Sequence, residues 1–353
     1  MEAASPVGLM AVLFSYVSLF ILSPLAQRFR LLDTPNHRKT HKGSVPLVGG
    51  LSAFLGVFMA WVIWMPVLSA HGLFLLCAAL LVIVGAVDDA RDLPANLRLA
   101  IQVILGAVLT IGSGTSLTTF GDLLGVGAVE LGMLGPLVTI AAVIGATNAF
   151  NMVDGIDGLA GSLSLVALGS LAWLFSSTPG FTTELALAMG IGCALVPYLM
   201  ANLRIPPFRR RIFMGDAGSM FIGFAVVWML VNATQPGHTA MRPVTALWII
   251  AVPLMDMVAI MFRRARKGES VMKPDRDHLH HIFMRAGFTD REALVAITLV
   301  ALTLATAGLL GEVYLVPEWF MFVAFLGLFG LYDWSLRHVW RLVVLLRKQH
   351  SYK

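Results

Sequence analysis

Long apolar runs separated by short polar segments recur along the whole chain. Leu73–Val87, Leu185–Ala201 and Thr245–Phe262 are examples. A helix needs about 20 mainly apolar residues to cross a bilayer, and runs of this kind are too frequent for one aqueous core. The pattern predicts eleven membrane-spanning helices, near residues 7–27, 47–65, 71–87, 97–113, 133–150, 158–176, 183–202, 215–232, 243–262, 292–312 and 318–337.

The composition agrees with this pattern. Of the 353 residues, 58% are hydrophobic and only 13% are charged, whereas soluble domains carry about a quarter charged residues. The chain is therefore interpreted as an all-α polytopic membrane protein. Residues 1–337 are expected to form a single integral membrane domain, and residues 338–353 a basic cytoplasmic tail.

The basic residues predict how the helices are oriented. No Lys or Arg precedes Arg28, so the first apolar run lacks the basic start of a signal peptide and is interpreted as a helix that enters from outside. With sides alternating from there, 24 of the 25 Lys and Arg residues fall inside and only Arg242 falls outside. The positive-inside rule then places the N-terminus in the periplasm and the C-terminus in the cytoplasm. Topology accounts for the net charge of +5, so no nucleic-acid partner is expected.

Aspartates gather on the same predicted face as the basic residues. A hydrated helix end explains any one of them, but two carboxylates about 4 Å apart repel by about 4 kcal/mol at an effective dielectric of 20. A converging set therefore needs cations, and Mg²⁺ is the natural candidate because it binds one or two carboxylates together with substrate phosphates. Seven residues form the set: Asp88, Asp89, Asp92, Asp154, Asp157, Asp216 and Asp256.

Two polar segments and one arginine add detail to the predicted site. The segment 88–92 ends an apolar helix, where the helix macrodipole disfavours negative charge, so the placement indicates a purpose. Asp216 stands between two glycines at a helix start, where free N–H groups favour an anion, although an ordinary helix cap is the alternative. Arg98 opens the helix after the first acidic segment, where it is placed to hold a phosphate.

A histidine-rich run, His278-Leu279-His280-His281, follows in the largest inside loop. Zinc is conceivable there, but the chain has no HExxH spacing and no cysteine partner for it. A loop that binds phosphate or sugar with His and Arg donors fits the basic surroundings better.

Together these motifs resemble the polyprenyl-phosphate N-acetylhexosamine-1-phosphate transferase family. The matching pieces occur in the family's order over nearly the whole chain: DDARD at 88–92, NAFNMVDGIDGL at 148–159, FMGDAGS at 213–219, PVTALWIIAVPLMDMVAIMFRR at 243–264 and HLHH at 278–281. The resemblance implies transfer of GlcNAc-1-phosphate from UDP-GlcNAc to undecaprenyl phosphate, giving undecaprenyl-diphosphate-GlcNAc and UMP. It also implies Mg²⁺ (or Mn²⁺) and the cytoplasmic face of the bacterial inner membrane. The reaction would be the first membrane step of a surface polysaccharide such as O-antigen or enterobacterial common antigen.

The resemblance also implies roles for individual residues. Asp216 and Asn151 would be Mg²⁺ ligands, and Asp88 would be the base that deprotonates the lipid phosphate, with Asp89 beside it. Asp157 would help to recognise uracil, on which Phe213 would stack. Asp154 is placed in the catalytic set, positioning metal-bound water. The expected substrate-binding residues are completed by Arg98, Arg264, His278, His280 and His281.

Two other functions, two reaction routes and the possibility of a homodimer remain open at this point. A sibling enzyme would use another UDP-N-acetylhexosamine, and an ion-coupled transporter would place its charges near the bilayer midplane in repeated halves. A one-step attack and a route through a covalent enzyme intermediate both fit the residues; one step is favoured because a lipid phosphate is already a competent nucleophile. A homodimer is also considered, with UDP-GlcNAc, undecaprenyl phosphate and the bilayer as the other partners.

Overall fold

The computed structural model describes residues 4–34, 43–65, 70–268 and 278–350. The basic residues Arg38, Lys39 and Lys42 lie outside these ranges. So does the segment 273–277, which directly precedes His278 in the sequence. The helices in chain order are α1 Ala4–Leu25, α2 Gly49–Trp64, α3 Ala70–Arg91, α4 Ala95–Ser113, α5 Gly135–Met152, α6 Leu159–Ser177, α7 Thr182–Asn202, α8 Gly215–Asn232, α9 Pro243–Ile249, α10 Ala251–Arg266, α11 Leu279–Arg285, α12 Asp290–Val313 and α13 Glu318–His350. A 3₁₀ turn, η1, spans Gly132–Leu134. Two short antiparallel pairs join β1 Leu32–Asp33 to β2 Val45–Pro46 and β3 Thr234–Gln235 to β4 His238–Thr239.

The structure confirms the all-α membrane architecture. Within the described residues, nine helices are long and apolar enough to cross a bilayer. Each of the eleven predicted segments is helical, but α2 has only 16 residues. The segment at 243–262 is not one helix, because α9 and α10 meet at an angle of 84°.

Pro253 explains this break. Proline has no N–H group, so it cannot donate to the carbonyl of Ile249 four residues earlier, and its ring clashes with that carbonyl in a continuous helix. The chain instead ends α9 at Ile249 and begins α10 at Ala251, which places Pro253 in the first turn of α10. The apolar run predicted one span here, and the proline explains why the structure divides that segment into two helices.

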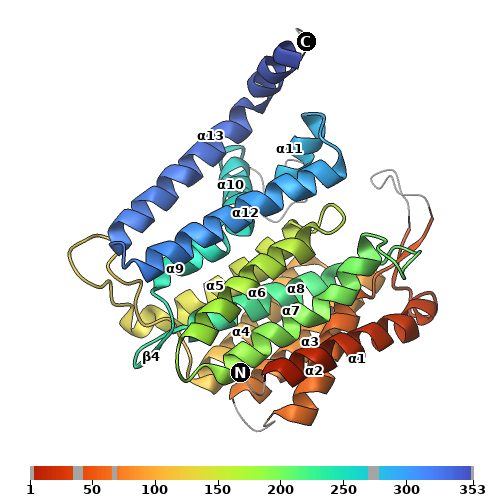
Figure 1. Cartoon of the computed structure of the whole chain (residues 1–353). Coiled ribbons are helices and arrows are strands. Elements are labelled where there is room, and N and C mark those ends of the chain that lie inside the picture. The colour runs from red at the N-terminus through yellow and green to blue at the C-terminus, as the bar shows by residue number, and fades with distance from the viewer. Residues whose placement is uncertain (1–3, 35–42, 66–69, 269–277, 351–353) are drawn as a thin grey trace.

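Helix α8 is the centre of the bundle. Nearly every residue from Ala217 to Val231 is buried, because α2, α3, α5 and α6 all pack against it. Helices α1 and α7 pack outside this layer, and α9, α12 and α13 form a second group on the other side (Figure 1). The start of α8 is therefore surrounded by the ends of several other helices.

Glycines allow the closest of these approaches. A Cβ atom on Gly50 of α2 would collide with the backbone of Gly218 of α8, and one on Gly85 of α3 would collide with the backbone of Ala217. Three helix backbones thus meet without intervening side chains. Small residues at such contacts are typical of helices that pack within a membrane.

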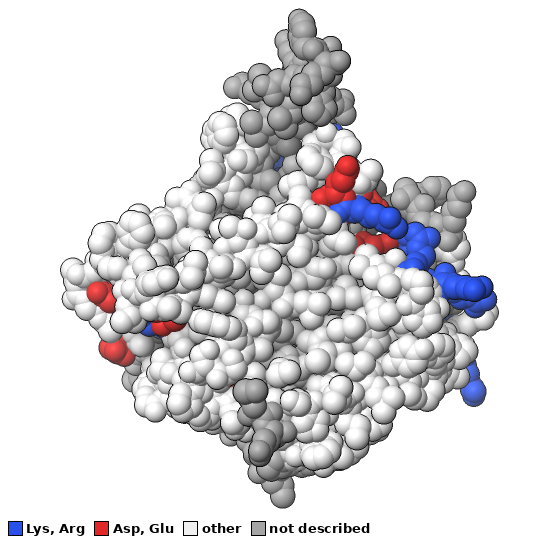
Figure 2. Space-filling model, in the orientation of Figure 1, with Lys and Arg blue, Asp and Glu red and all other residues white. Residues whose placement is uncertain are grey.

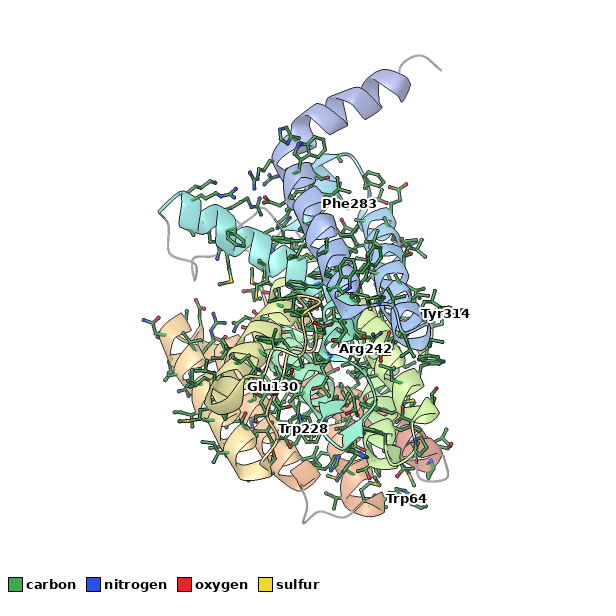
Figure 3. All side chains as sticks on the ribbon, turned by 90° about the vertical axis from the view of Figure 1, so that its left-hand side faces the viewer. Trp64, Glu130, Trp228, Arg242, Phe283 and Tyr314 are labelled. Carbon is green, nitrogen blue, oxygen red and sulfur yellow. The ribbon has the colours of Figure 1, made fainter. Side chains whose placement is uncertain are left out.

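Charged side chains lie at the two ends of the bundle. Figure 2 shows Lys and Arg gathered on the right with acidic side chains beside them, a few charges on the left, and a broad uncharged surface between. Arg242, the one basic residue predicted outside, lies beyond the lower end of α12, well away from Phe283 of α11 (Figure 3). It pairs with Glu312 at 3.3 Å and donates to the carbonyls of Gly311 and Val316 at 2.8 Å. It therefore ties α9 to the end of α12.

Substituting Gly50→Ala is expected to lower the stability of the bundle by about 1–3 kcal/mol, because the added methyl must push α2 away from α8. The measurement is the thermal unfolding midpoint of the purified protein in detergent. Gly169→Ala on α6 is the matched control, since no atom lies within 4 Å of a Cβ built there. Equal midpoints for the two variants would contradict the proposed backbone contact.

Candidate functional site

A cavity of about 790 Å³ opens at the charged end of the bundle, next to the start of α8. Its walls come from loops and helix ends that are far apart in sequence, and they carry eight carboxylates. These are Asp33, Asp88, Asp89, Asp92, Asp154, Asp157, Asp216 and Asp290. Six of the seven predicted acids are thus brought together, and Asp256 is the exception. Asn151, Arg211, Phe213 and His281 line the same cavity.

Asp89 caps α8 from a different helix. Its carboxylate accepts hydrogen bonds from the backbone N–H of Asp216 at 2.9 Å and of Ala217 at 3.3 Å. Gly215 has φ +74° and no side chain, which leaves room for this carboxylate. Negative charge at a helix N-terminus is stabilising. Asp216 was considered as an ordinary helix cap, but it does not cap α8 with its own side chain.

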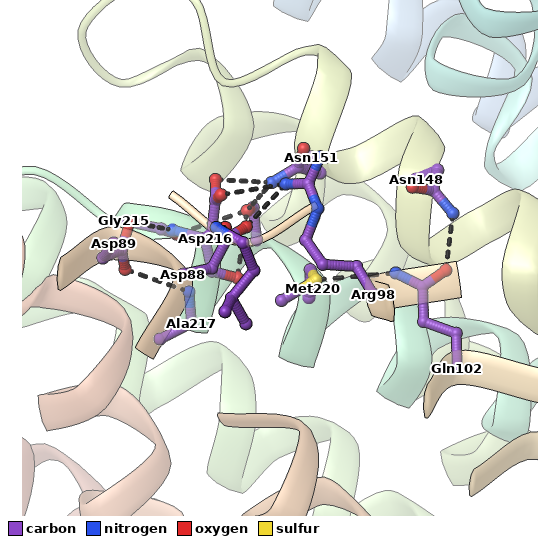
Figure 4. Close-up of polar contacts among 12 residues, drawn as sticks. Asp88, Asp89, Arg98, Gln102, Asn148, Asn151, Gly215, Asp216, Ala217 and Met220 are labelled. Carbon is purple, nitrogen blue, oxygen red and sulfur yellow. Dashed lines mark hydrogen bonds and ion pairs between the residues drawn. The ribbon is translucent and has the colours of Figure 1, made fainter. Parts of the chain in front are cut away.

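The Asp216 side chain is consequently free to face Arg98 and Asn151 (Figure 4). Asn151 on α5 donates to one carboxylate oxygen of Asp216 at 2.8 Å, and Arg98 on α4 donates to the other at 3.3 Å. The same Arg98 nitrogen lies 2.6 Å from Asp88, which is only 5% exposed and also accepts from the Leu93 N–H. Four helices therefore contribute one polar side chain each to a single cluster.

The cluster suits a hard cation by its donor chemistry. Asp88 and Asp216 share one guanidinium, which offsets only part of the repulsion between the two carboxylates. Asn151 and Asp216, the predicted Mg²⁺ ligands, are in direct contact, and reversing the Asn151 amide would present its oxygen to an ion. Among the described residues, no group of three His, Cys, Asp or Glu side chains is arranged around one point. The donors fit an ion that takes its other ligands from water and a substrate.

The other wall of the cavity carries Asp157 and Phe213. Asp157 pairs with Arg211 at 2.9 Å. The backbone of Phe213 is fixed on both sides, because its N–H donates to Pro46 and its carbonyl accepts from Gly49, both at 2.9 Å. Arg211 was not among the predicted site residues, although its position two residues before the FMGDAGS motif could have indicated it.

Asp154 lies in the short loop between α5 and α6, and its side chain is partly buried. Burial is the largest cause that raises the pKa of Asp154 to about 7, and the negative charges of Asp216 and Asp157 add to it. A proton or a cation near neutral pH would therefore relieve the local repulsion. The catalytic role predicted for this residue stays a prediction.

Asp256 has a different task from the other acids. It accepts hydrogen bonds from the Leu279 N–H at 3.1 Å and from the Tyr332 hydroxyl at 2.7 Å, and it lies 3.1 Å from His278 Nδ1. A buried carboxylate thus anchors the start of α11 to α10 and α13. Its position on the same face predicted membership of the acidic set, but these partners hold it apart from the cavity.

The three histidines divide in the same way. His280 is buried against Gly155, and burial, followed by the charges of His281 and His278, lowers its pKa to about 3. It is therefore neutral at physiological pH. Only His281 lines the cavity, whereas His278 is held by Asp256. Arg264 is buried on α10 and is not among the cavity-lining residues, so the binding roles predicted for Arg264, His278 and His280 have no support from this geometry.

Comparison with known proteins is consistent with these motifs. Residues 71–234 match the glycosyl transferase family 4. The undecaprenyl-phosphate alpha-N-acetylglucosaminyl 1-phosphate transferase of Yersinia pestis is 44% identical over 337 residues, which cover 95% of this chain and 92% of that protein. The proteins of the same name from Escherichia coli strain K12 and Haemophilus influenzae are also 44% identical, over 95% of this chain and 92% and 94% of their own lengths.

Replacing Asp154 by Asn is expected to stabilise the metal-free protein more at pH 8.5 than at pH 5.5. With its pKa raised to about 7, the carboxyl is mostly neutral at the lower pH and is a costly carboxylate at the higher pH. Because the same carboxyl ionises near its ordinary value of 3.8 in the unfolded chain, the native protein loses stability as the pH rises from there to about 7, and the amide does not. Thermal midpoints in EDTA measure the difference.

Asp290→Asn serves as the matched control, because Asp290 lines the same cavity but is exposed to water. An equal gain from Asp154→Asn at both pH values would show that the carboxylate carries no such cost.

Proposed function

Because this chain belongs to the undecaprenyl-phosphate alpha-N-acetylglucosaminyl 1-phosphate transferases of glycosyl transferase family 4, we propose that it transfers GlcNAc-1-phosphate from UDP-GlcNAc to undecaprenyl phosphate. The observation that carries the proposal is the cluster of Asp88, Arg98, Asn151 and Asp216 at one end of a membrane bundle. A water-soluble donor and a lipid acceptor can meet only at such an end.

The reaction exchanges one P–O bond for another. An oxygen of the lipid phosphate attacks the phosphorus that carries the sugar, the bond from that phosphorus to the UMP oxygen breaks, and UMP leaves. Reactions of this type depend on positioning and charge neutralisation more than on covalent help. A cavity of about 790 Å³ lined by carboxylates and the guanidinium group of Arg211 has the required size and chemistry.

Asp88 is the residue that we assign to the acceptor phosphate. Its carboxylate can accept a proton, and its contact with Arg98 at 2.6 Å places a positive charge beside it, where a phosphate can bind. The two residues therefore form a base and an anion site side by side. This supports a one-step attack, in which the lipid phosphate is the nucleophile and no enzyme intermediate forms.

Asp216 and Asn151 are the residues that would hold Mg²⁺. The ion would supply charge neutralisation for the diphosphate of the donor. Asp89 contributes indirectly, since it fixes the first turn of α8 on which Asp216 stands. We assign Asp154, which lines the same cavity, to positioning water or a ligand of the ion.

The Asp157 and Phe213 wall is assigned to the uridine end of the donor. A carboxylate can accept the uracil N–H, and an aromatic ring can stack on the base. The ion pair with Arg211 orients Asp157, and the two backbone hydrogen bonds hold Phe213 in place.

We assign the protein to the bacterial inner membrane with this cavity on the cytoplasmic side. Support comes from the basic residues, 24 of 25 of which fall on one side of the predicted topology. Its lipid product would begin a surface polysaccharide such as O-antigen. A homodimer stays a prediction.

Purified protein is expected to transfer label from radiolabelled UDP-GlcNAc to undecaprenyl phosphate when Mg²⁺ is present, and to stop when EDTA is added. The readout is label in the lipid phase after extraction. No metal-dependent labelled lipid would overturn the assignment, whereas equal use of UDP-GalNAc would favour the sibling with broader donor choice. Exchange of labelled UMP into UDP-GlcNAc without acceptor lipid would reveal the two-step route.

Asp88→Asn is expected to lower kcat by about 100-fold or more, because the amide cannot take the proton from the lipid phosphate. It keeps the acceptor atom for the Leu93 N–H, so the thermal midpoint should change far less than the rate. Asp122→Asn, in the loop after α4, is the matched control and should keep its activity. A rate loss shared by both variants would remove Asp88 from this role.

A further inference from the structure

A second cavity, of about 630 Å³, lies beside the first one. Its walls come from the end of α1, the β1–β2 pair and the loop between α7 and α8. The lining residues include Arg204, Arg209, Arg210 and Arg211 and no carboxylate. The two cavities share Leu32 and Arg211, but their charges are opposite, since the first contains eight aspartates. A site with four cations and no acid among its lining residues suits an anion.

Three of these arginines have no acidic partner within the described part of the chain. Arg211 pairs with Asp157 of the first cavity. Arg204, Arg209 and Arg210 are exposed, and among the described residues none has a carboxylate within ion-pair distance. Guanidinium groups bind phosphate oxygens with two parallel hydrogen bonds. The proposed function gives none of these three residues a task.

The cavity also lies at the level where a bilayer would meet water. Ser23, Pro24 and Gln27 line it from the end of α1, a helix apolar enough to span a membrane. On the same end of α1, Phe20 is 55% exposed and Ile21 is 56% exposed. Large apolar side chains exposed on a spanning helix are in contact with lipid.

Aromatic contacts tie the arginine loop to this surface. Phe208, the neighbour of Arg209, stacks on Phe20 at a ring distance of 5.9 Å and meets Tyr16 at 5.7 Å. Aromatic side chains are enriched at the membrane–water boundary. The arginines are therefore held just above an apolar surface, at the depth of phospholipid headgroups.

We propose that this cavity binds the phosphate headgroup of an anionic phospholipid, with the acyl chains along Phe20 and Ile21 of α1. Basic pockets between spanning helices suit anionic headgroups. A free phosphate or a nucleotide would use the arginines but not the apolar surface beside them, so the combination favours a lipid. The proposal does not depend on the reaction that the first cavity performs.

The test titrates dioctanoyl phosphatidylglycerol into the full-length protein in a neutral detergent at fixed ionic strength and follows the thermal midpoint. The midpoint is expected to rise for the native protein, whereas dioctanoyl phosphatidylcholine should leave it unchanged. In the double variant Arg209→Gln/Arg210→Gln the apparent affinity should fall by about 30-fold, since each arginine near an anionic headgroup contributes about a factor of five. The matched control Arg28→Gln/Arg266→Gln removes two exposed charges outside the cavity and should keep the native response.

Inorganic phosphate, UMP and undecaprenyl phosphate are the competing probes. An arginine-dependent rise with phosphate or UMP equal to that with phosphatidylglycerol would overturn the lipid assignment. A rise with undecaprenyl phosphate but not with phosphatidylglycerol would give the cavity to the acceptor lipid instead. Equal losses in the two double variants would show attraction to overall charge and no site. Only a loss confined to Arg209→Gln/Arg210→Gln, with the phospholipid as probe, supports the proposal.

Discussion

The hydrogen bonds from the first turn of α8 to the Asp89 carboxylate hold the candidate site together. The first turn of a helix leaves N–H groups without partners, and Gly215 and Ala217 at the start of α8 are buried. A charge from α3 supplies the partner, and the glycine contacts at Gly50 and Gly85 let the three helices approach closely enough. Asp216 can then direct its side chain to Arg98 and Asn151. The polar cluster of the candidate site is thus a consequence of how α8 is capped.

Much of this architecture could be predicted from hydropathy, because a bilayer requires long apolar helices and tolerates few charges between them. The acids of four helix ends and loops were likewise expected to converge, since topology alone puts them on one side. The break before Pro253 was missed because the apolar run continues through it. A proline within an apolar run needs to be weighed separately from its hydropathy.

Hydropathy could not predict which polar residues face the cavity and which hold helices together. Asp256 and Asp216 were both predicted to lie on the same membrane face, yet one anchors α11 and the other faces the cavity. Likewise His280 and His281 are adjacent, but only His281 reaches the cavity, because successive residues of a helix point in different directions. Such distinctions depend on partners more than 20 residues away, including Tyr332 for Asp256. Family resemblance assigned the histidines as a group, and packing separates them.

Arg211 lines both cavities, and this shared position has a thermodynamic consequence for ligand binding in them. Its guanidinium is paired with Asp157 on one side and faces the arginine-rich cavity on the other. An anion that drew Arg211 toward the arginine-rich cavity would weaken its hold on Asp157, and binding in the two cavities would then be energetically coupled. Linkage makes that coupling reciprocal: whatever factor a bound headgroup applies to nucleotide affinity, the nucleotide must apply to the headgroup. The lipid composition of the surrounding bilayer would then change the affinity for the nucleotide donor through the Arg211 side chain.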